Sequence, residues 1–127
     1  MYPEDLRYSK EHEWVKVGGD RGRVGITDYA QEELGDVVNV ELPPIGRTVR
    51  QFNPFGVVES VKAVQDLYAP VSGTVVAVNE KLRDTPEVIN QAPYGEGWMI
   101  QVKLENPAEL DNLMSAAEYQ GFLQTKG

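Results

Sequence analysis

Short apolar runs alternate with turn-forming residues along most of the chain, a pattern typical of many short β-strands. The runs are rich in β-branched residues and are bounded by Gly, Pro, Asn and Asp, as strands joined by tight turns usually are. We expect strands over residues 13–17, 23–26, 37–42, 48–51, 55–61, 67–69, 74–78 and 98–104. The last run alternates most clearly, with its even-numbered residues on one face. The pattern predicts an all-β barrel or sandwich.

One short helix is predicted inside this β-rich region. Thr27 is a suitable N-cap, and Gly35 stands where the C-terminal end of a helix favours glycine. We therefore expect a two-turn helix over Asp28–Leu34. Residues 79–97 contain mostly turn-forming residues, with room for one helical turn at Glu87–Asn90.

The period of the pattern changes near the C-terminus. Asn106 is a predicted N-cap, Pro107 follows at the first helical position, and apolar residues then recur at helical spacing. We expect two short helices or one kinked helix, forming a cap over about 107–125 that covers the open edge of the sheet. Because no repeat or long linker interrupts the chain, residues 1–127 are predicted to form a single domain with accessory helices.

Composition narrows the possible functions. Twelve Lys and Arg stand against 20 Asp and Glu, so the net charge is −8. Phosphate backbones and anionic membranes repel such a protein, and we expect neither as a partner. The chain has no cysteine and one histidine, His12, which leaves almost nothing for a zinc site or a Ser-His-Asp triad. The sequence therefore favours a protein that is not an enzyme and has no metal or catalytic site, and whose reactive group, if it has one, is not genetically encoded.

The sequence contains no signal for a membrane or for secretion. No apolar run reaches the 18 or so residues that a spanning helix needs. The N-terminal residues have neither the apolar core of a signal peptide nor the basic character of a transit peptide. We expect a cytoplasmic location, or the mitochondrial matrix if a transit peptide has been removed.

The β-rich segment Gly56–Asp66 contains a lone lysine, Lys62, between valine and alanine. Strand alternation places Lys62 on the same face as Ser60 and opposite Glu59. A chain reversal near Lys62–Asp66 would place the lysine at a hairpin tip, projecting into water. Taken by itself, such a residue is more simply interpreted as a solvated strand lysine that keeps an edge from aggregating.

Several motifs, spread over nearly the whole chain in a fixed order, change that interpretation. They are His12-Glu13-Trp14-Val15, Gly25-Ile26-Thr27-Asp28-Tyr29-Ala30-Gln31, Leu34-Gly35-Asp36, Val40-Glu41-Leu42-Pro43, Val58-Glu59-Ser60-Val61-Lys62-Ala63, Pro70-Val71-Ser72-Gly73 and Pro93-Tyr94-Gly95-Glu96-Gly97-Trp98. Each motif alone is weak, but together they resemble the H protein of the glycine cleavage system. The resemblance implies a barrel-sandwich hybrid of lipoyl-domain type, with two small sheets, a short internal helix and a C-terminal helical segment.

The resemblance also implies a function and its cofactor. In the family, a lysine flanked by a short motif carries lipoic acid in amide linkage. The motif here consists of Glu59, Ser60, Val61 and Ala63, and the lysine is Lys62. The lipoyl arm accepts an aminomethyl group from pyridoxal-phosphate glycine decarboxylase and presents it to a tetrahydrofolate-dependent aminomethyltransferase. Dihydrolipoamide dehydrogenase then reoxidises the arm with FAD and NAD. A lipoate-attaching enzyme is a fourth partner, and we expect a monomeric carrier that is a substrate of these enzymes.

Family members are thought to fold the loaded arm into a cleft, where a carboxylate would hold its ammonium end. Glu13 matches the family position for this role, although by residue type alone it would be a surface glutamate on an edge strand. Some members have a histidine where this chain has Glu33, so Glu33 would be a second docking carboxylate. His12 is expected to be solvated or to cap a turn, and Trp14 to pack in the core.

Two other classes of protein remain as alternatives. The first is a lipoyl or biotinyl carrier of another complex, or a lipoyl relay, which also carries its cofactor on an exposed lysine. Such domains usually read Asp-Lys-Ala or Met-Lys-Met, whereas this chain reads Val61-Lys62-Ala63 and is longer at both ends. The other alternative is a non-covalent β-barrel binding module, although an oligonucleotide-binding barrel would require a basic, aromatic face.

Overall fold

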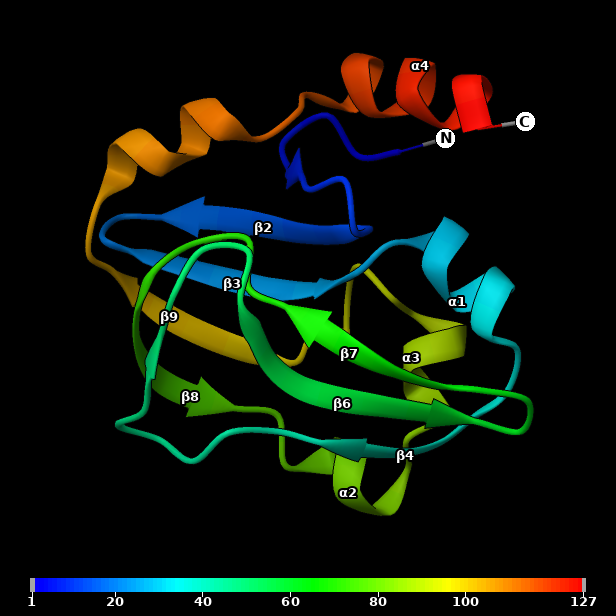
Figure 1. The fold of residues 1–127 in the computed structure, drawn as a ribbon. Coiled ribbons are helices and arrows are strands. Elements are labelled where there is room, and N and C mark those ends of the chain that lie inside the picture. The colour runs from blue at the N-terminus through cyan, green and yellow to red at the C-terminus, as the bar shows by residue number, and fades with distance from the viewer. Residues whose placement is uncertain (1, 127) are drawn as a thin grey trace.

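Two antiparallel sheets make up most of the molecule (Figure 1). The computed structural model describes residues 2–126. The larger sheet contains, in spatial order, β1 (Arg7–Tyr8), β2 (Glu13–Gly18), β3 (Arg21–Ile26), β9 (Ile100–Leu104), β8 (Gly73–Val78) and β5 (Thr48–Val49). The smaller sheet contains β4 (Val37–Glu41), β6 (Pro54–Ser60) and β7 (Val64–Tyr68). This arrangement confirms the predicted fold class of two small sheets with accessory helices.

Short helices connect and cover the sheets. They are α1 (Asp28–Leu34), α2 (Lys81–Asp84), α3 (Val88–Gln91), the 3₁₀ helix η1 (Pro107–Asn112) and α4 (Ala116–Lys126). Among residues 2–126, no helix has both the length and the apolar character needed to cross a membrane.

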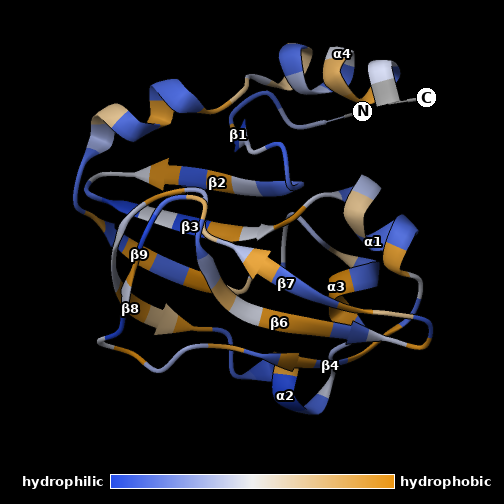
Figure 2. Cartoon of the chain, in the orientation of Figure 1, coloured by the Kyte–Doolittle hydropathy of each residue, from blue (hydrophilic) through white to orange (hydrophobic). Residues whose placement is uncertain are grey.

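The main core lies between the sheets, where the alternation of each strand directs apolar side chains inward. Along β9, Ile100 and Val102 are fully buried whereas Lys103 is exposed. Figure 2 shows this alternation as orange and blue bands on β9. Burying each such side chain contributes about 1.5–3 kcal/mol, so the strand pattern fixes which face of each sheet is internal.

The helix predicted over Asp28–Leu34 is confirmed at both ends. Thr27 Oγ1 accepts a hydrogen bond of 3.2 Å from the Ala30 N–H. Gly35 has a φ of 78° and donates its N–H to the Gln31 carbonyl oxygen at 3.0 Å. A glycine is needed there because other residues rarely adopt a positive φ.

Several local predictions differ from the structure. The strand expected at 67–69 covers Val64–Tyr68 instead, because β7 pairs with β6 almost to the hairpin tip. The strand expected at 48–51 ends at Val49. The segment 79–97 contains two helical turns rather than one, since Leu82 and Ile89 both anchor a turn in the core.

The C-terminal segment forms the two short helices that the sequence allowed, and it covers the edge of the larger sheet. Met114 exchanges two backbone hydrogen bonds with Tyr8 of the edge strand β1, each 2.8 Å long. Tyr119 of α4 is fully buried, and its hydroxyl lies 2.8 Å from Thr27 Oγ1 and 2.7 Å from Nδ1 of His12. His12 is therefore a half-buried contact of α4, and Trp14 is fully buried as predicted.

Candidate functional site

The β6–β7 hairpin presents Lys62 at its tip. Glu59 pairs with Val64, so the chain reverses over residues 60–63. Lys62 is exposed there. The tip of the β6–β7 hairpin lies beside the connection between α1 and β4 (Figure 1). The prediction of a hairpin tip is confirmed, but the predicted strand face is not, because β6 ends at Ser60 and Lys62 belongs to the turn.

Ser60 shapes this turn from inside. Its backbone N–H donates to the Ala63 carbonyl oxygen at 2.8 Å. Its Oγ accepts hydrogen bonds from the backbone N–H groups of Ala63, at 3.1 Å, and of Lys62, at 3.3 Å. A serine hydroxyl is suited to bonding the backbone two or three residues ahead, so the small buried Ser60 stiffens the turn that carries the lysine.

The connection between α1 and β4 supports the tip from the side. The Val61 N–H donates to the Asp36 carbonyl oxygen at 3.0 Å. The Lys62 stem lies over Gly35, where an added Cβ would come 3.5 Å from Lys62 Cε. Gly35 therefore both ends α1 and leaves room for the lysine side chain.

The surroundings of Lys62 leave its amine available for reaction. Within residues 2–126, none of the ion pairs involves Lys62. Its neighbours Val61 and Val64 are 69% and 66% exposed, and Glu59 is exposed on the strand before it. A long primary amine on a stiff, reachable turn is suited to acylation, which is the fit that an amide-linked lipoyl group requires.

Glu13 is placed very differently from the surface position expected for its residue type. It is only 2% exposed, and β2 lies between β1 and β3 rather than at an edge. Its Oε1 accepts a 2.5 Å hydrogen bond from the Ser9 hydroxyl, and its Oε2 accepts the Tyr68 N–H at 3.1 Å. Glu13 thereby links the larger sheet to the base of the hairpin that carries Lys62.

Burial raises the pKa of Glu13 to about 8, because the charged carboxylate loses its hydration. The hydrogen bonds from Ser9 and from the Tyr68 N–H act in the opposite direction but are outweighed. Near neutral pH the carboxyl group is therefore mostly protonated unless a positive charge comes close to it.

A hollow of about 470 Å³ opens on the surface beside this region. Its lining residues are Tyr8, Lys10, Glu11, Phe52, Tyr68, Asn112 and Met114. Glu13 does not line the hollow, but Tyr68 and Glu11 do, and Tyr68 is the residue whose N–H Glu13 binds. The hollow thus combines apolar side chains with two exposed charged ones of opposite sign, Lys10 and Glu11.

The two predicted docking carboxylates are not brought together by any contact among the described residues. Glu33 is exposed in the last turn of α1, two residues before Gly35. It therefore lies on the side of Lys62, whereas Glu13 lies at the other end of the hairpin, beside Tyr68. Within residues 2–126, no group of three or more His, Asp or Glu side chains is placed to hold a metal ion.

Two residues near the site were not predicted from the sequence. Glu11 lines the hollow, and Asn90 of α3 is hydrogen-bonded to the Gly35 carbonyl oxygen. The signal for Asn90 was an amide side chain inside a predicted helical turn, where its alternative hydrogen bonds usually make it unfavourable. No sequence signal pointed to Glu11.

Comparison with known proteins identifies the family. A family model described as Glycine cleavage H-protein matches residues 6–126. The chain belongs to this family. A curated glycine cleavage system H protein of Symbiobacterium thermophilum is 63% identical over 120 residues, which is 94% of each chain. One from Carboxydothermus hydrogenoformans is 55% identical over 127 residues, covering 100% of this chain and 98% of that protein.

The fold agrees with the same assignment. The crystal structure of a glycine cleavage system H protein from Mycobacterium marinum matches with a TM-score of 0.88 and 43% identity, over 94% of this chain and 97% of that one. The resemblance seen in the sequence motifs is therefore confirmed, as is the lipoyl-domain-like barrel-sandwich architecture. Family membership also confirms the predicted role as the shuttle protein of the glycine cleavage system.

Proposed function

We propose that this chain carries lipoic acid in amide linkage on Lys62 and acts as a carrier rather than as a catalyst. The observation that supports this most strongly is the exposed Lys62 on a turn held by Ser60 and by Asp36. When attached, the lipoyl group would supply the chemistry: its disulfide would be reduced as it takes up the aminomethyl group, and the dithiol left after transfer would be reoxidised by the dehydrogenase. The protein's own residues supply an amine that can be reached without unfolding.

Each residue of the motif around Lys62 has its own role. Ser60 fixes the turn, and Ala63, with its single methyl group, leaves space for an approaching enzyme. Val61 is exposed but anchored through its N–H to Asp36. Glu59 offers a charge on the exposed strand before the tip. We propose that a lipoate-attaching enzyme acts on this motif.

The three enzymes that would use the arm are glycine decarboxylase, the aminomethyltransferase and dihydrolipoamide dehydrogenase. We propose that each docks a neutral or basic surface against this acidic chain, which carries a net charge of −8, in the cytoplasm. We further propose that the chain works as a monomeric, single-domain carrier. Docking should weaken as salt rises, and turnover with the decarboxylase that is independent of salt would contradict this electrostatic contribution.

Glu13 is proposed to hold the ammonium end of the loaded arm, with the neighbouring hollow receiving the arm. An approaching ammonium would lower the pKa of Glu13 from about 8, so holding the arm would favour release of the carboxyl proton. Retention of the loaded arm should therefore strengthen as pH rises toward about 8 and level off above it. A Glu13→Gln protein that retains its loaded arm as long as the wild type does would disprove this role.

The proposed function is tested by incubation with lipoate, ATP and a lipoate ligase, followed by intact mass measurement and peptide mapping. We expect a single lipoyl addition on the peptide containing Lys62 and none on Lys62→Arg. A folded wild-type protein that takes up no lipoyl group, while a control carrier is modified in the same reaction, would overturn the proposal.

A further inference from the structure

Asn90 is hydrogen-bonded to three residues within one short stretch of the chain, residues 31–37. Its Nδ2 donates hydrogen bonds to the Gly35 carbonyl oxygen and to Gln31 Oε1, each 2.9 Å long. Its Oδ1 accepts the Val37 N–H at 2.9 Å. One half-buried side chain on α3 thus binds the last turn of α1, the residue that ends this helix and the first residue of β4.

These bonds hold the short turn against which the hairpin tip rests. Gly35 and Asp36 lie between the groups that Asn90 binds. The Asp36 carbonyl oxygen accepts the Val61 N–H, and the backbone of Gly35 faces the Lys62 stem. A continuous path of contacts therefore runs from Asn90 through Gly35 and Asp36 to the lysine.

We infer that Asn90 is a positioning residue for Lys62, an inference that rests on the function proposed above. Without its amide, the Gly35 carbonyl oxygen and the Val37 N–H lose their side-chain partner, and the turn beneath the lysine loosens. Ser60 still closes the hairpin, but the tip loses its fixed place beside α1. An enzyme that acts on Lys62 then meets the amine in many orientations, and misplacement of a reacting group lowers the rate.

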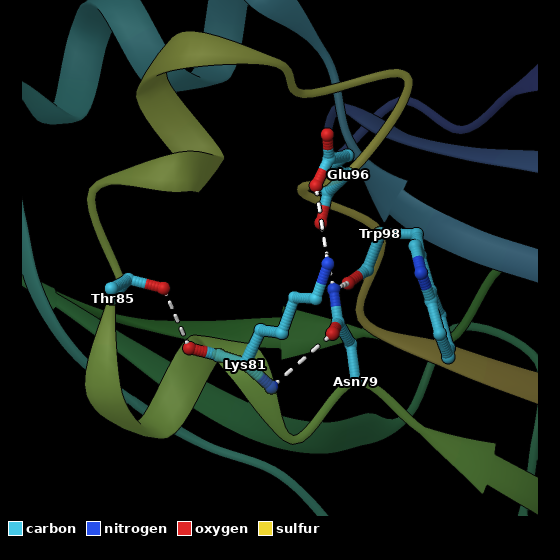
Figure 3. A network of polar contacts seen from close by, with 5 residues as sticks. All are labelled: Asn79, Lys81, Thr85, Glu96 and Trp98. Atoms are coloured by element: carbon cyan, nitrogen blue, oxygen red, sulfur yellow. Dashed lines mark hydrogen bonds and ion pairs between the residues drawn. The ribbon is translucent and has the colours of Figure 1, made fainter.

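Asn79 offers a matched control in the same 79–97 segment. Its Nδ2 donates to the carbonyl oxygens of Glu96, at 2.7 Å, and Trp98, at 2.8 Å, and its Oδ1 accepts the Lys81 N–H at 3.3 Å. Figure 3 shows this amide between Lys81 and the segment that contains Glu96 and Trp98. Its bonding resembles that of Asn90, but none of its hydrogen-bond partners belongs to the turn beneath Lys62.

The experiment compares Asn90→Asp with Asn79→Asp in the full chain. Each substitution keeps the acceptor oxygen and removes both donated hydrogen bonds. Three quantities are measured: kcat/KM for lipoyl attachment by a lipoate ligase, hydrogen exchange of the Val61 amide, and the denaturant midpoint. We expect Asn90→Asp to lower kcat/KM by about tenfold and to speed Val61 exchange. Asn79→Asp should lower the denaturant midpoint comparably while keeping kcat/KM within about twofold of the wild type.

A gentler variant keeps the inference testable if Asn90→Asp does not fold. Gln31→Ala removes only one acceptor of the Asn90 amide, and it should produce a smaller change of the same sign in kcat/KM and in Val61 exchange. Equal losses of kcat/KM in the Asn79 and Asn90 variants would overturn the positioning role, as would unchanged Val61 exchange. In either case, wild-type attachment to Lys62 would leave the proposed function standing. Absence of attachment to the wild type would overturn both.

Discussion

Lys62 and Glu13 lie at opposite ends of one hairpin and in opposite environments. Lys62 is exposed at the tip, and its surroundings hold the backbone rather than the amine. Glu13 is 2% exposed at the base, and both of its carboxyl oxygens are hydrogen-bonded inside the protein. The amine of Lys62 is free to react while the backbone that carries it is held in place. The carboxyl group of Glu13, by contrast, is itself hydrogen-bonded into the fold.

The two environments meet two different physical requirements, one for a reactive side chain and one for a buried carboxyl group. A side chain that several enzymes must reach needs solvent and a stiff turn, and its removal leaves the fold intact. A buried carboxyl group needs partners for its oxygens, and its charge state depends on how completely water is excluded. Changes at Lys62 should therefore alter modification, and changes at Glu13 should alter stability and its pH dependence.

The largest contrast is expected from Lys62→Arg. Attachment of the lipoyl group should be lost completely, while the free energy of unfolding stays within about 0.5 kcal/mol of the wild type, because the side chain is exposed. Intact mass and urea unfolding measure the two effects. Strong destabilisation by this substitution would mean that the lysine itself is structural.

Glu13→Ala is expected to have the opposite profile. The Ser9 hydroxyl and the Tyr68 N–H lose their acceptor, and leaving such buried groups unpaired costs about 1–3 kcal/mol. Urea unfolding at pH 7 measures the loss. Lys62 should still accept a lipoyl group from the ligase in this variant, and failure to do so would mean that the two ends of the hairpin are coupled.

The stability of the wild type should fall as pH rises from about 4.5 to about 8. The folded pKa of Glu13 is raised from 4.5 to about 8, so between these values the folded state holds a proton that the unfolded state has released. The free energy of unfolding should decrease by up to about 1.4 kcal/mol per pH unit in this window and level off above it. Urea unfolding at a series of pH values should show a flatter profile for Glu13→Gln; an equally steep profile would assign the effect to other groups.

Ser60→Ala is expected to have a smaller effect, at the tip. It removes the acceptor of two backbone N–H groups and should cost about 1 kcal/mol of stability. Because the turn loosens, lipoyl attachment to Lys62 should slow by a few-fold, as measured with the ligase. A rate equal to that of the wild type would show that the hairpin alone, without the serine, fixes the tip.

Glu33→Gln should have the smallest effect. Glu33 is exposed on α1, so the free energy of unfolding should change by no more than about 0.5 kcal/mol. The time for which the loaded arm is retained should change less than in Glu13→Gln. A larger change would move the docking role from Glu13 to the side of Lys62.

The sequence by itself determined the elements whose signals are local. Thr27 and Gly35 marked the ends of α1 through capping chemistry, and the alternation of 98–104 marked the whole of β9, although the strand begins two residues later than predicted. The motif around Lys62, with the turn residues that follow it, predicted an exposed lysine at a hairpin tip. Such signals depend only on neighbours within a few residues, so the amino-acid sequence alone is enough to predict these elements.

Tertiary structure decided the features that join distant segments. Glu13 and Tyr68 are 55 residues apart, and only the packing of the two sheets buries the carboxyl group and makes the Tyr68 N–H its partner. Asn90 and Gly35 are likewise 55 residues apart, and α3 brings the amide to the end of α1. Desolvation and long-range hydrogen bonds are properties of the assembled core, so the sequence supplies the residue type but not the environment that sets its chemistry.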